Sequence, residues 1–368
     1  MMLGLDPEVM RAATPPFADL FPTVEWQVGG HCNYDCSYCI QSKKSRVGQP
    51  DEVRVDAILA GLASLPASVR WEVKMSGGEP FAARLFLERI VPGLVERTPH
   101  LVSVLTNFSA PAKSLERFVR LTGDRLRITS ASLHLESVEP APFLERARLY
   151  RDVRREVAPK SSFVINSVVV PGTVARLLDV QAECEAEGFR FFPQLMKMNG
   201  GVFDYAPDER PLVERLLRGS VDPREVNRAP SYEGLHCEAG VWYFTLDQDG
   251  EAWSCRTAKR FAKARVASLA KARVACLDGA AARDVASLAK ARVASLDGAA
   301  ARDVASLGNM VDGTFALKTR GGPCPFSICP CTVPANRGIV RLPGREASAG
   351  SLTPPGLVRI ATTEVPHG

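Results

Sequence analysis

Several features that would place this sequence in a class at once are missing from its 368 residues. It contains no run of about 18 or more apolar residues, so we expect no transmembrane helix. Its first residues, MMLGLDPEVMRAATPPF, have neither a basic stretch nor a continuous apolar core, unlike a secretory signal peptide. We therefore expect a cytoplasmic protein with no membrane partner, whose cysteines stay reduced and available to metals.

A large excess of one charge is also missing. The net charge is +5, and the segment 261–307 alone holds eight Lys or Arg against four Asp. Because the rest of the chain is close to neutral, its charge gives no reason to expect nucleic-acid binding. The length exceeds what one hydrophobic core usually serves, so we expect one large domain and a smaller one.

Six short apolar runs alternate with helical patterns between residues 24 and 200. The runs are rich in Val, Ile or Phe, and most end in small polar residues: VEWQVGG, RWEVKMSGG, LVSVLTN, LRITSASLH, SFVINSVVV and FRFFPQLM. Helix-like segments such as DEVRVDAILAGLASL, FAARLFLERIVPGLVERT and TVARLLDVQAECEAEGF lie between them. The alternation predicts an α/β fold with a parallel sheet, either doubly wound or curled into a barrel. In both cases functional groups gather at the C-terminal ends of the strands.

The rest of the chain differs in composition. Residues 1–23 read as an N-terminal extension, 201–231 as a connector with one short helix, and 341–368 as a mobile tail. Between them, 232–340 predict a small Cys-rich α+β domain with a β-hairpin around Asp249–Gly250. This domain is interrupted at 261–307 by a 19-residue Ala-rich repeat. The repeat is either a partner-binding arm or, as we favour, a duplication tolerated in a surface loop.

Three cysteines, Cys32, Cys36 and Cys39, lie within eight residues directly after the first predicted strand. A redox dithiol made of Cys36 and Cys39 would leave Cys32 without a role. A zinc site would take a fourth ligand from elsewhere, because zinc prefers four. The third interpretation is a [4Fe–4S] cluster bound by three thiolates, whose remaining iron is open to a substrate or cofactor.

The stretch CNYDCSYC has the C-x3-C-x-aromatic-C spacing of the radical S-adenosylmethionine enzymes, with Tyr38 as the aromatic residue. The sequence resembles this superfamily in a second motif, MSGGEP, at the end of the second predicted strand. The resemblance covers roughly residues 24–196, and it implies a partial (β/α)6 TIM-like barrel. It also implies reductive cleavage of S-adenosylmethionine at the cluster, giving a 5′-deoxyadenosyl radical that abstracts hydrogen from a substrate.

The resemblance implies contacts of several residues with S-adenosylmethionine. Two glycines let the backbone approach a ligand closely, and a carboxylate can accept a hydrogen bond from an ammonium group. His134, on the fourth predicted strand, faces the rim or the barrel wall and is a candidate for contact with substrate or cofactor. The expected cofactor-binding residues are Tyr38, Gly77, Gly78, Glu79, Thr106, Ser132, Asn166 and Gln194.

A second set of cysteines follows in the C-terminal region. Cys237 and Cys255 have the spacing C-x12-G-x4-C, and GGPCPFSICPC adds Cys324, Cys329 and Cys331. This pattern resembles the SPASM/twitch extensions of the same superfamily, which house auxiliary [4Fe–4S] clusters. Five thiols suffice for one such cluster, and which four bind it is left open. A structural zinc is the alternative, whereas a disulfide is disfavoured in a reducing compartment.

Superfamily members with this extension often modify peptides, so we expect a peptide or protein substrate and an external electron donor of the flavodoxin or ferredoxin type. Only about 25 residues precede the barrel, which we expect to be too few for a leader-peptide-binding domain. One alternative is a radical enzyme acting on a nucleotide or sugar. The other is a non-catalytic metal-binding scaffold.

Overall fold

The computed structural model describes residues 22–41, 48–66, 69–198, 201–218, 232–260, 306–326, 329 and 339–340. Nearly all of the N-terminal extension, the repeat at 261–305, the tail and Cys331 lie outside these residues. The predictions made for those segments therefore stay predictions.

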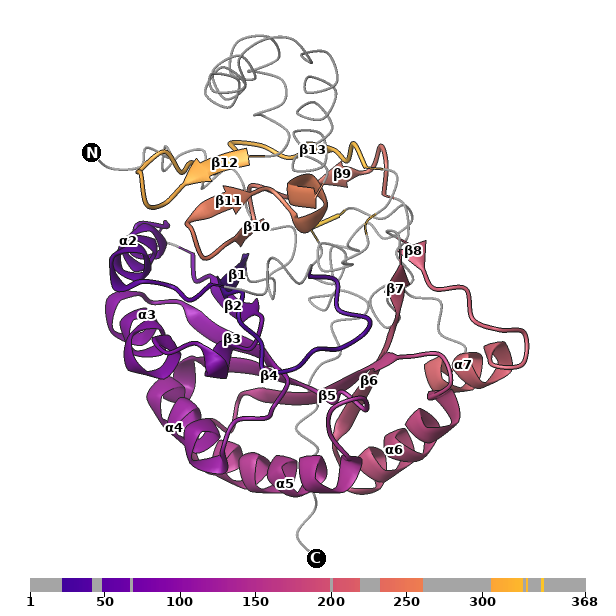
Figure 1. Ribbon diagram of the computed structural model, residues 1–368. Helices are drawn as coiled ribbons and strands as arrows, with labels where there is room; N and C mark the ends of the chain where they lie inside the picture. Colours follow the sequence, from indigo (N-terminus) through magenta and orange to yellow (C-terminus); the bar gives the residue numbers. More distant parts are fainter. Residues whose placement is uncertain are drawn as a thin grey trace, which may run out of the picture.

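A curved parallel sheet forms the centre of the molecule (Figure 1). Its first six strands pair in chain order, and the arc that they form does not close into a full barrel. The predicted partial (β/α)6 barrel is therefore confirmed, and all six predicted strands are present. They are β1 (Thr23–Gly29), β2 (Glu72–Gly77), β3 (Leu101–Thr106), β4 (Leu126–Ser132), β5 (Ser162–Val169) and β6 (Arg190–Leu195).

Helices cover the outer side of this arc (Figure 1). They are α2 (Glu52–Ala63), α3 (Val91–Arg97), α4 (Ala112–Thr122), α5 (Pro140–Val157) and α6 (Val174–Ala186), with short turns η2 (Pro80–Ala82), η3 (Phe86–Ile90) and η4 (Gly123–Arg125). The helix expected over 81–98 is interrupted. The N–H of Ile90 bonds the carbonyl of Leu85, so η3 is a π-helical turn, and α3 begins only at Val91. Pro92, which lacks an N–H and cannot bond the preceding turn, follows directly.

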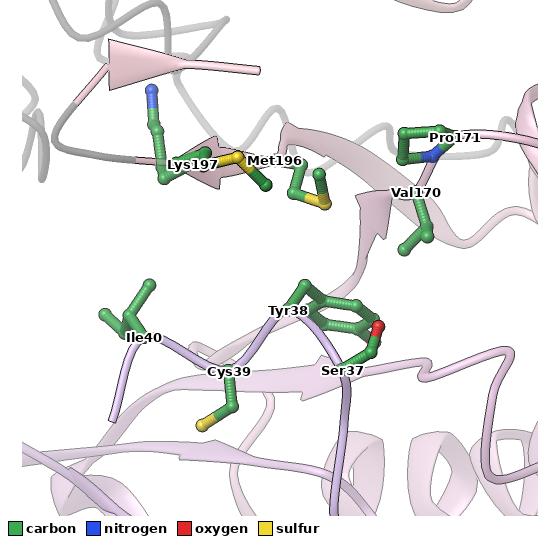
Figure 2. A pocket seen from close by; sticks show the side chains of 9 residues that line it. Ser37, Tyr38, Cys39, Ile40, Val170, Pro171, Met196 and Lys197 are labelled. Carbon is green, nitrogen blue, oxygen red and sulfur yellow. The ribbon is translucent and has the colours of Figure 1, made fainter. Parts of the chain in front are cut away.

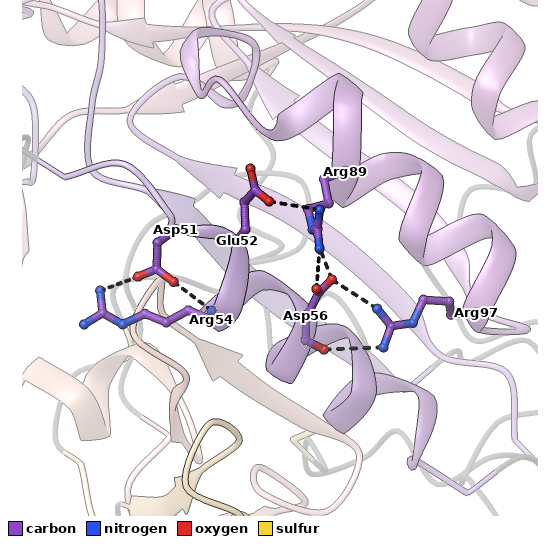
Figure 3. A network of polar contacts seen from close by, with 6 residues as sticks. All are labelled: Asp51, Glu52, Arg54, Asp56, Arg89 and Arg97. Atoms are coloured by element: carbon purple, nitrogen blue, oxygen red, sulfur yellow. Dashed lines mark hydrogen bonds and ion pairs between the residues drawn. The ribbon is translucent and has the colours of Figure 1, made fainter.

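An exposed network of charges joins α2 to η3 and α3 (Figure 3). Arg89 and Arg97 both donate to Asp56, and Arg89 also contacts Glu52 at 3.2 Å. Hydrogen bonds from Arg89 lower the pKa of the Asp56 carboxyl below its ordinary value. Because these side chains face solvent, the network orients the helices more than it stabilises them.

Three strands from the C-terminal region extend the same sheet beyond β1. β10 (Tyr243–Leu246) pairs in parallel with β1, and β11 (Glu251–Trp253) and β12 (Ser306–Asn309) continue outward in antiparallel pairs. The hairpin predicted around Asp249–Gly250 is confirmed. Phe244 of β10 packs edge-on against Trp71 with ring centroids 5.7 Å apart. These strands therefore share the core of the barrel in addition to its sheet.

Smaller elements complete the described chain: β7 (Lys197–Met198), β8 (Gly201–Val202), α7 (Arg210–Leu217), β9 (His236–Cys237) and β13 (Gly322–Pro323). α7 is the short helix expected in the connector, and its apolar residues Val213, Leu216 and Leu217 pack with Leu177 of α6. Among the described helices, none has the length and apolarity needed to cross a bilayer.

Candidate active site

The loop after β1, residues 30–41, which we call the cysteine loop, packs directly on the end of β2. The N–H of Gly78 bonds the carbonyl of Gly29, and the N–H of Glu79 bonds that of His31 at 2.7 Å. A Cβ on Gly78 would lie 1.8 Å from the His31 carbonyl oxygen. Gly77 has φ of +145°, a backbone conformation that side chains disfavour. Two glycines are needed here because backbone atoms occupy the space of their side chains: those of Gly29, at the end of β1, at Gly77, and those of the cysteine loop at Gly78.

All three N-terminal cysteines lie on the cysteine loop. Cys36 is 8% exposed, Cys32 is half-buried and Cys39 is exposed. Burial raises the pKa of the Cys36 thiol, and the nearby Cys32 and Cys39 raise it further, while a hydrogen bond from Tyr38 opposes the rise. The three sulfurs are therefore near enough to affect one another electrostatically. No group of three His, Cys, Asp or Glu side chains in the described ranges converges on a point suited to a single ion. In a four-iron cluster each thiolate binds its own iron, and three cysteine thiolates on one loop are a suitable donor set for it.

Glu79 is buried next to this loop, at the ends of β2 and β3. Its Oε1 accepts from the Thr106 hydroxyl at 2.6 Å and from the Phe81 N–H at 3.1 Å. Its Oε2 accepts from the Asn107 N–H at 2.6 Å, which leaves that oxygen a further acceptor site. Burial raises the pKa of Glu79 to about 7, although these hydrogen bonds oppose the rise. The carboxylate is thus held in place, and among the described residues no cationic side chain is paired with it.

The turn after β3 connects Glu79 to the cysteine loop. The side-chain amide of Asn107 donates to Asn33 Oδ1 at 2.8 Å and lies 4.0 Å from Cys32 Sγ. The next residue, Phe108, is fully buried with φ of +59°, which is strained for a bulky side chain. Its carbonyl accepts from Arg146 at 2.6 Å. Local backbone strain of this kind concentrates at functional sites.

The segment after β4 contacts the cysteine loop from the other side. His134 Nδ1 lies 2.7 Å from the Tyr38 hydroxyl and 3.4 Å from Cys36 Sγ. Burial lowers the pKa of His134 to about 4, so the imidazole is neutral near pH 7. Two residues further on, Glu136 accepts from the backbone N–H and the hydroxyl of Ser37, at 2.8 and 2.5 Å. These contacts fix the loop at Cys36 and at the two residues that follow it.

The remaining expected cofactor-binding residues lie on the strand ends. The Ser132 hydroxyl at the end of β4 donates to Asn166 Oδ1 of β5 at 2.9 Å, and the Asn166 amide donates to Ser130 at the same distance. Both side chains therefore link β4 to β5 at the rim. Gln194, on β6 opposite Val168, stands apart from this group.

A pocket of ≈ 410 Å³ opens between the cysteine loop and the ends of β5 and β6 (Figure 2). Figure 2 shows the loop residues on one side and the strand-end residues on the other. Ile40 and Met198, which are 76% and 51% exposed, contribute apolar surface to its lining. A molecule bound there would lie against the loop that carries the three cysteines. The lining residues are Ser37, Tyr38, Cys39, Ile40, Val170, Pro171, Met196, Lys197 and Met198.

The structure places four C-terminal cysteines in two neighbouring apolar clusters that share Cys237. Cys237 of β9 and Cys324 pack with Cys329, around Tyr232 and Val340. Cys237 also packs against the cluster that contains Cys255, so it belongs to both clusters. Burial, aided by the neighbouring Cys324, raises the pKa of Cys237 to about 12. We call Cys237, Cys255, Cys324 and Cys329 the C-terminal cysteines.

Known proteins resemble part of this chain. The sequence model of the Radical SAM superfamily matches residues 26–172. This portion runs from β1 to the turn after β5, so the matched part of the chain is similar to a radical SAM domain. The three cysteines of the cysteine loop and Glu79 lie inside the matched region.

Individual relatives are distant. GTP 3′,8-cyclase of Stenotrophomonas maltophilia (strain K279a) is 27% identical over 129 residues, which is 34% of this chain, and the match spans 39% of the length of that enzyme. Native anSMEcpe with bound AdoMet and Cp18Cys peptide has a TM-score of 0.46 at 15% identity, over 64% of this chain and 74% of the other. SuiB of Streptococcus suis bound to the precursor peptide SuiA has a TM-score of 0.48 at 14% identity, over 67% and 62%.

Two residues of the site were not singled out from the sequence. Asn107 is the last residue of the run LVSVLTN, and its position after a parallel strand was the available signal. Glu136 follows His134 in LHLE, and only its hydrogen bonds to Ser37 reveal its role. Cys331 lies outside the described residues, so its part in the C-terminal set stays a prediction.

Proposed function

We propose that Cys32, Cys36 and Cys39 hold a [4Fe–4S] cluster at which this protein cleaves S-adenosylmethionine reductively. One observation carries the proposal: the cysteine loop packs on Gly78, where an added Cβ would lie 1.8 Å from the carbonyl oxygen of His31. The cysteines and the Gly-Gly-Glu motif therefore form one unit. When bound, the cluster and S-adenosylmethionine supply the electron transfer and the carbon radical that abstracts hydrogen.

The protein side chains then bind and orient the cofactor. Glu79 has a free acceptor site on Oε2 and a pKa of about 7, so a bound ammonium group would stabilise its ionised form. Thr106 and Asn107 hold the carboxylate in place from β3. Ser132 and Asn166 supply polar groups at the adjacent strand ends. Tyr38 lines the pocket beside the loop.

We assign a second cluster to the C-terminal cysteines. Support comes from the placement of four thiols in two clusters that share Cys237, although up to 92 residues separate them in the sequence, from Cys237 to Cys329. Thiolates are the ligands of iron–sulfur clusters, and four of them suffice for one. A structural zinc with four thiolate ligands is the competing occupant. Metal analysis separates the two.

The substrate that we favour is a peptide or protein, by analogy with the SPASM/twitch-like cysteine pattern of the C-terminal region. The apolar pocket beside Cys39, with Met196, Met198 and Ile40 in its lining, suits a side chain of such a substrate. A nucleotide is the second candidate, since the relative from Stenotrophomonas maltophilia is a GTP cyclase. Production of 5′-deoxyadenosine that depends on an added peptide, and not on GTP, would support the first.

The first experiment measures iron and sulfide after anaerobic reconstitution, with EPR of the reduced protein before and after S-adenosylmethionine is added. We expect about eight irons per chain and one signal that shifts on addition. Four irons with that shift would support the cluster in the barrel and rule out the one at the C-terminal cysteines. Zinc without iron would instead favour a non-catalytic scaffold and overturn the proposal.

A further inference from the structure

Cys36 differs from its two partners in what surrounds its sulfur. It is the most buried of the three thiols. Two side chains with polar hydrogens face it: His134 Nδ1 lies 3.4 Å from Sγ, and the Tyr38 hydroxyl hydrogen-bonds to the thiol. These two groups also lie 2.7 Å from each other. One sulfur, one ring nitrogen and one hydroxyl thus form a compact triangle.

Ring packing holds this triangle together. The Tyr38 and His134 rings are stacked with an interplanar angle of 13°, and Tyr34 packs edge-on against His134 with centroids 5.8 Å apart. Tyr34 and Tyr38 both lie on the cysteine loop, whereas His134 comes from the segment after β4. The imidazole is therefore fixed between two aromatic side chains, with Nδ1 directed at the Cys36–Tyr38 pair.

The direction of the hydrogen bonds follows from the chemistry of the sulfur. A thiolate that binds iron carries no proton, so it can only accept. The hydrogens in the triangle must then come from the Tyr38 hydroxyl and from Nδ1–H of His134. In the arrangement that satisfies all three atoms, Nδ1–H donates to the Tyr38 oxygen and the Tyr38 hydroxyl donates to Cys36.

We propose that Tyr38 and His134 act as positioning residues that raise the reduction potential of the cluster held at Cys36, by donating hydrogen bonds toward its sulfur. The inference rests on the proposed function, since it requires that cluster. Reduction adds negative charge to the cluster and its sulfurs, so a donor stabilises the reduced form more than the oxidised form. A buried hydrogen bond is also electrostatically stronger than one in water.

Redox titration of the EPR signal that responds to S-adenosylmethionine tests this inference. Tyr38→Phe deletes one oxygen atom, and His134→Leu removes the ring nitrogen. Both variants are expected to move the midpoint potential to more negative values. His134→Asn places an amide N–H near the position of Nδ1 and should restore most of the wild-type potential. Tyr150→Phe removes a buried hydroxyl that bonds Thr129, away from the cysteine loop, and should leave the potential unchanged.

The possible outcomes are distinct. An unchanged potential in Tyr38→Phe and His134→Leu, with full iron content, overturns the inference and leaves the proposed function standing. An equal shift in Tyr150→Phe also overturns it, because the effect would then be a general loss of packing. If His134→Leu fails to assemble a cluster, the midpoint potential of Tyr38→Phe alone tests the inference. A wild-type protein without a responsive cluster refutes the proposed function, and this inference with it.

Discussion

The guanidinium Nε of Arg256 lies 2.6 Å from Oε2 of Glu25, although 231 residues separate them in the chain. Glu25 is in β1 and is 3% exposed, and the Tyr243 hydroxyl donates to the same oxygen at 2.8 Å. Burial alone would raise the pKa of Glu25, but the charges of Arg256 and Lys74 bring it down to about 2. Because Arg256 directly follows Cys255, this ion pair ties one of the C-terminal cysteines to the first strand of the barrel.

Replacing Arg256 with Met should lower the free energy of unfolding by about 2 kcal/mol, measured by chemical denaturation. The loss is smaller than for a fully buried pair because the Arg256 side chain is 36% exposed and Tyr243 still donates to Glu25. Arg120→Met is the matched control, since Arg120 pairs with Glu116 on the surface of α4. It should change stability by less than about 0.5 kcal/mol. Equal losses in both variants would contradict this account of Glu25.

Glu79 should make stability fall as the pH rises. Its pKa is about 7 in the folded protein against an ordinary value of 4.5. Below pH 4.5 Glu79 is protonated in both the folded and the unfolded chain. Between pH 4.5 and pH 7 it is ionised only in the unfolded chain, so the free energy of unfolding falls as the pH rises, and above pH 7 it stops falling. The full loss is about 3 kcal/mol.

Glu79→Gln removes this titration. The difference in unfolding free energy between the metal-free wild type and the variant should change by about 3 kcal/mol between pH 4 and pH 8, in favour of the variant at high pH. Taking the difference cancels the other titrating groups. A difference that does not vary with pH would show that Glu79 has an ordinary pKa.

Gly78→Ala should displace the cysteine loop. The added methyl carbon would lie 1.8 Å from the His31 carbonyl oxygen, so the loop backbone must move. We expect less than a tenth of the wild-type iron to be retained after reconstitution. Gly172→Ala is the control, because Gly172 also has a positive φ, +80°, but open space around its Cβ position. Its cost should be about 1 kcal/mol of conformational strain, with iron content preserved. Retention of full iron by Gly78→Ala would refute the packing argument.

Cys237→Ala should halve the iron content, from about eight to about four, while the EPR signal that responds to S-adenosylmethionine persists. Cys237 contacts both parts of the C-terminal set, so its loss leaves too few neighbouring thiols for a cluster. Cys184→Ala is the comparison, since this buried cysteine of α6 lies in the helical layer. It should cost stability without removing iron. Iron loss of the same size in both variants would argue against the assignment.

Local features of the sequence predicted the barrel well. Buried parallel strands read as continuous apolar runs, and the cysteine loop and Gly-Gly-Glu motif follow the strands that the pattern predicted. Helix α4 was expected only through the alternation of strands and helices, and its own segment was not singled out, although Leu115, Phe118, Val119 and Thr122 form a buried stripe at helical spacing. The break at η3 also went unpredicted, because a π-helical turn leaves little trace in the hydrophobic pattern.

Contacts between distant segments could not be predicted in the same way. Nothing in the sequence near Glu25 indicates a partner at Arg256, and the pairing of β10 with β1 has no local pattern behind it. The site shows the same limit. Thr106, which was expected near the cofactor, donates a hydrogen bond to Glu79. The hydrogen bond from Ser37 to Glu136 depends on how two loops pack against each other.

The parallel pairing of β1 with β10 also bears on how the chain folds. β1 is bonded on one side to β2, which follows closely, and on the other to β10, more than 200 residues later. Until β10 is synthesised and docks, β1 presents an unpaired apolar edge that can recruit strands of other chains. Closing so long a loop is slow, and a chain that stops after β6 would keep that edge open. Aggregation during expression should therefore depend on the C-terminal hairpin more than on the barrel itself.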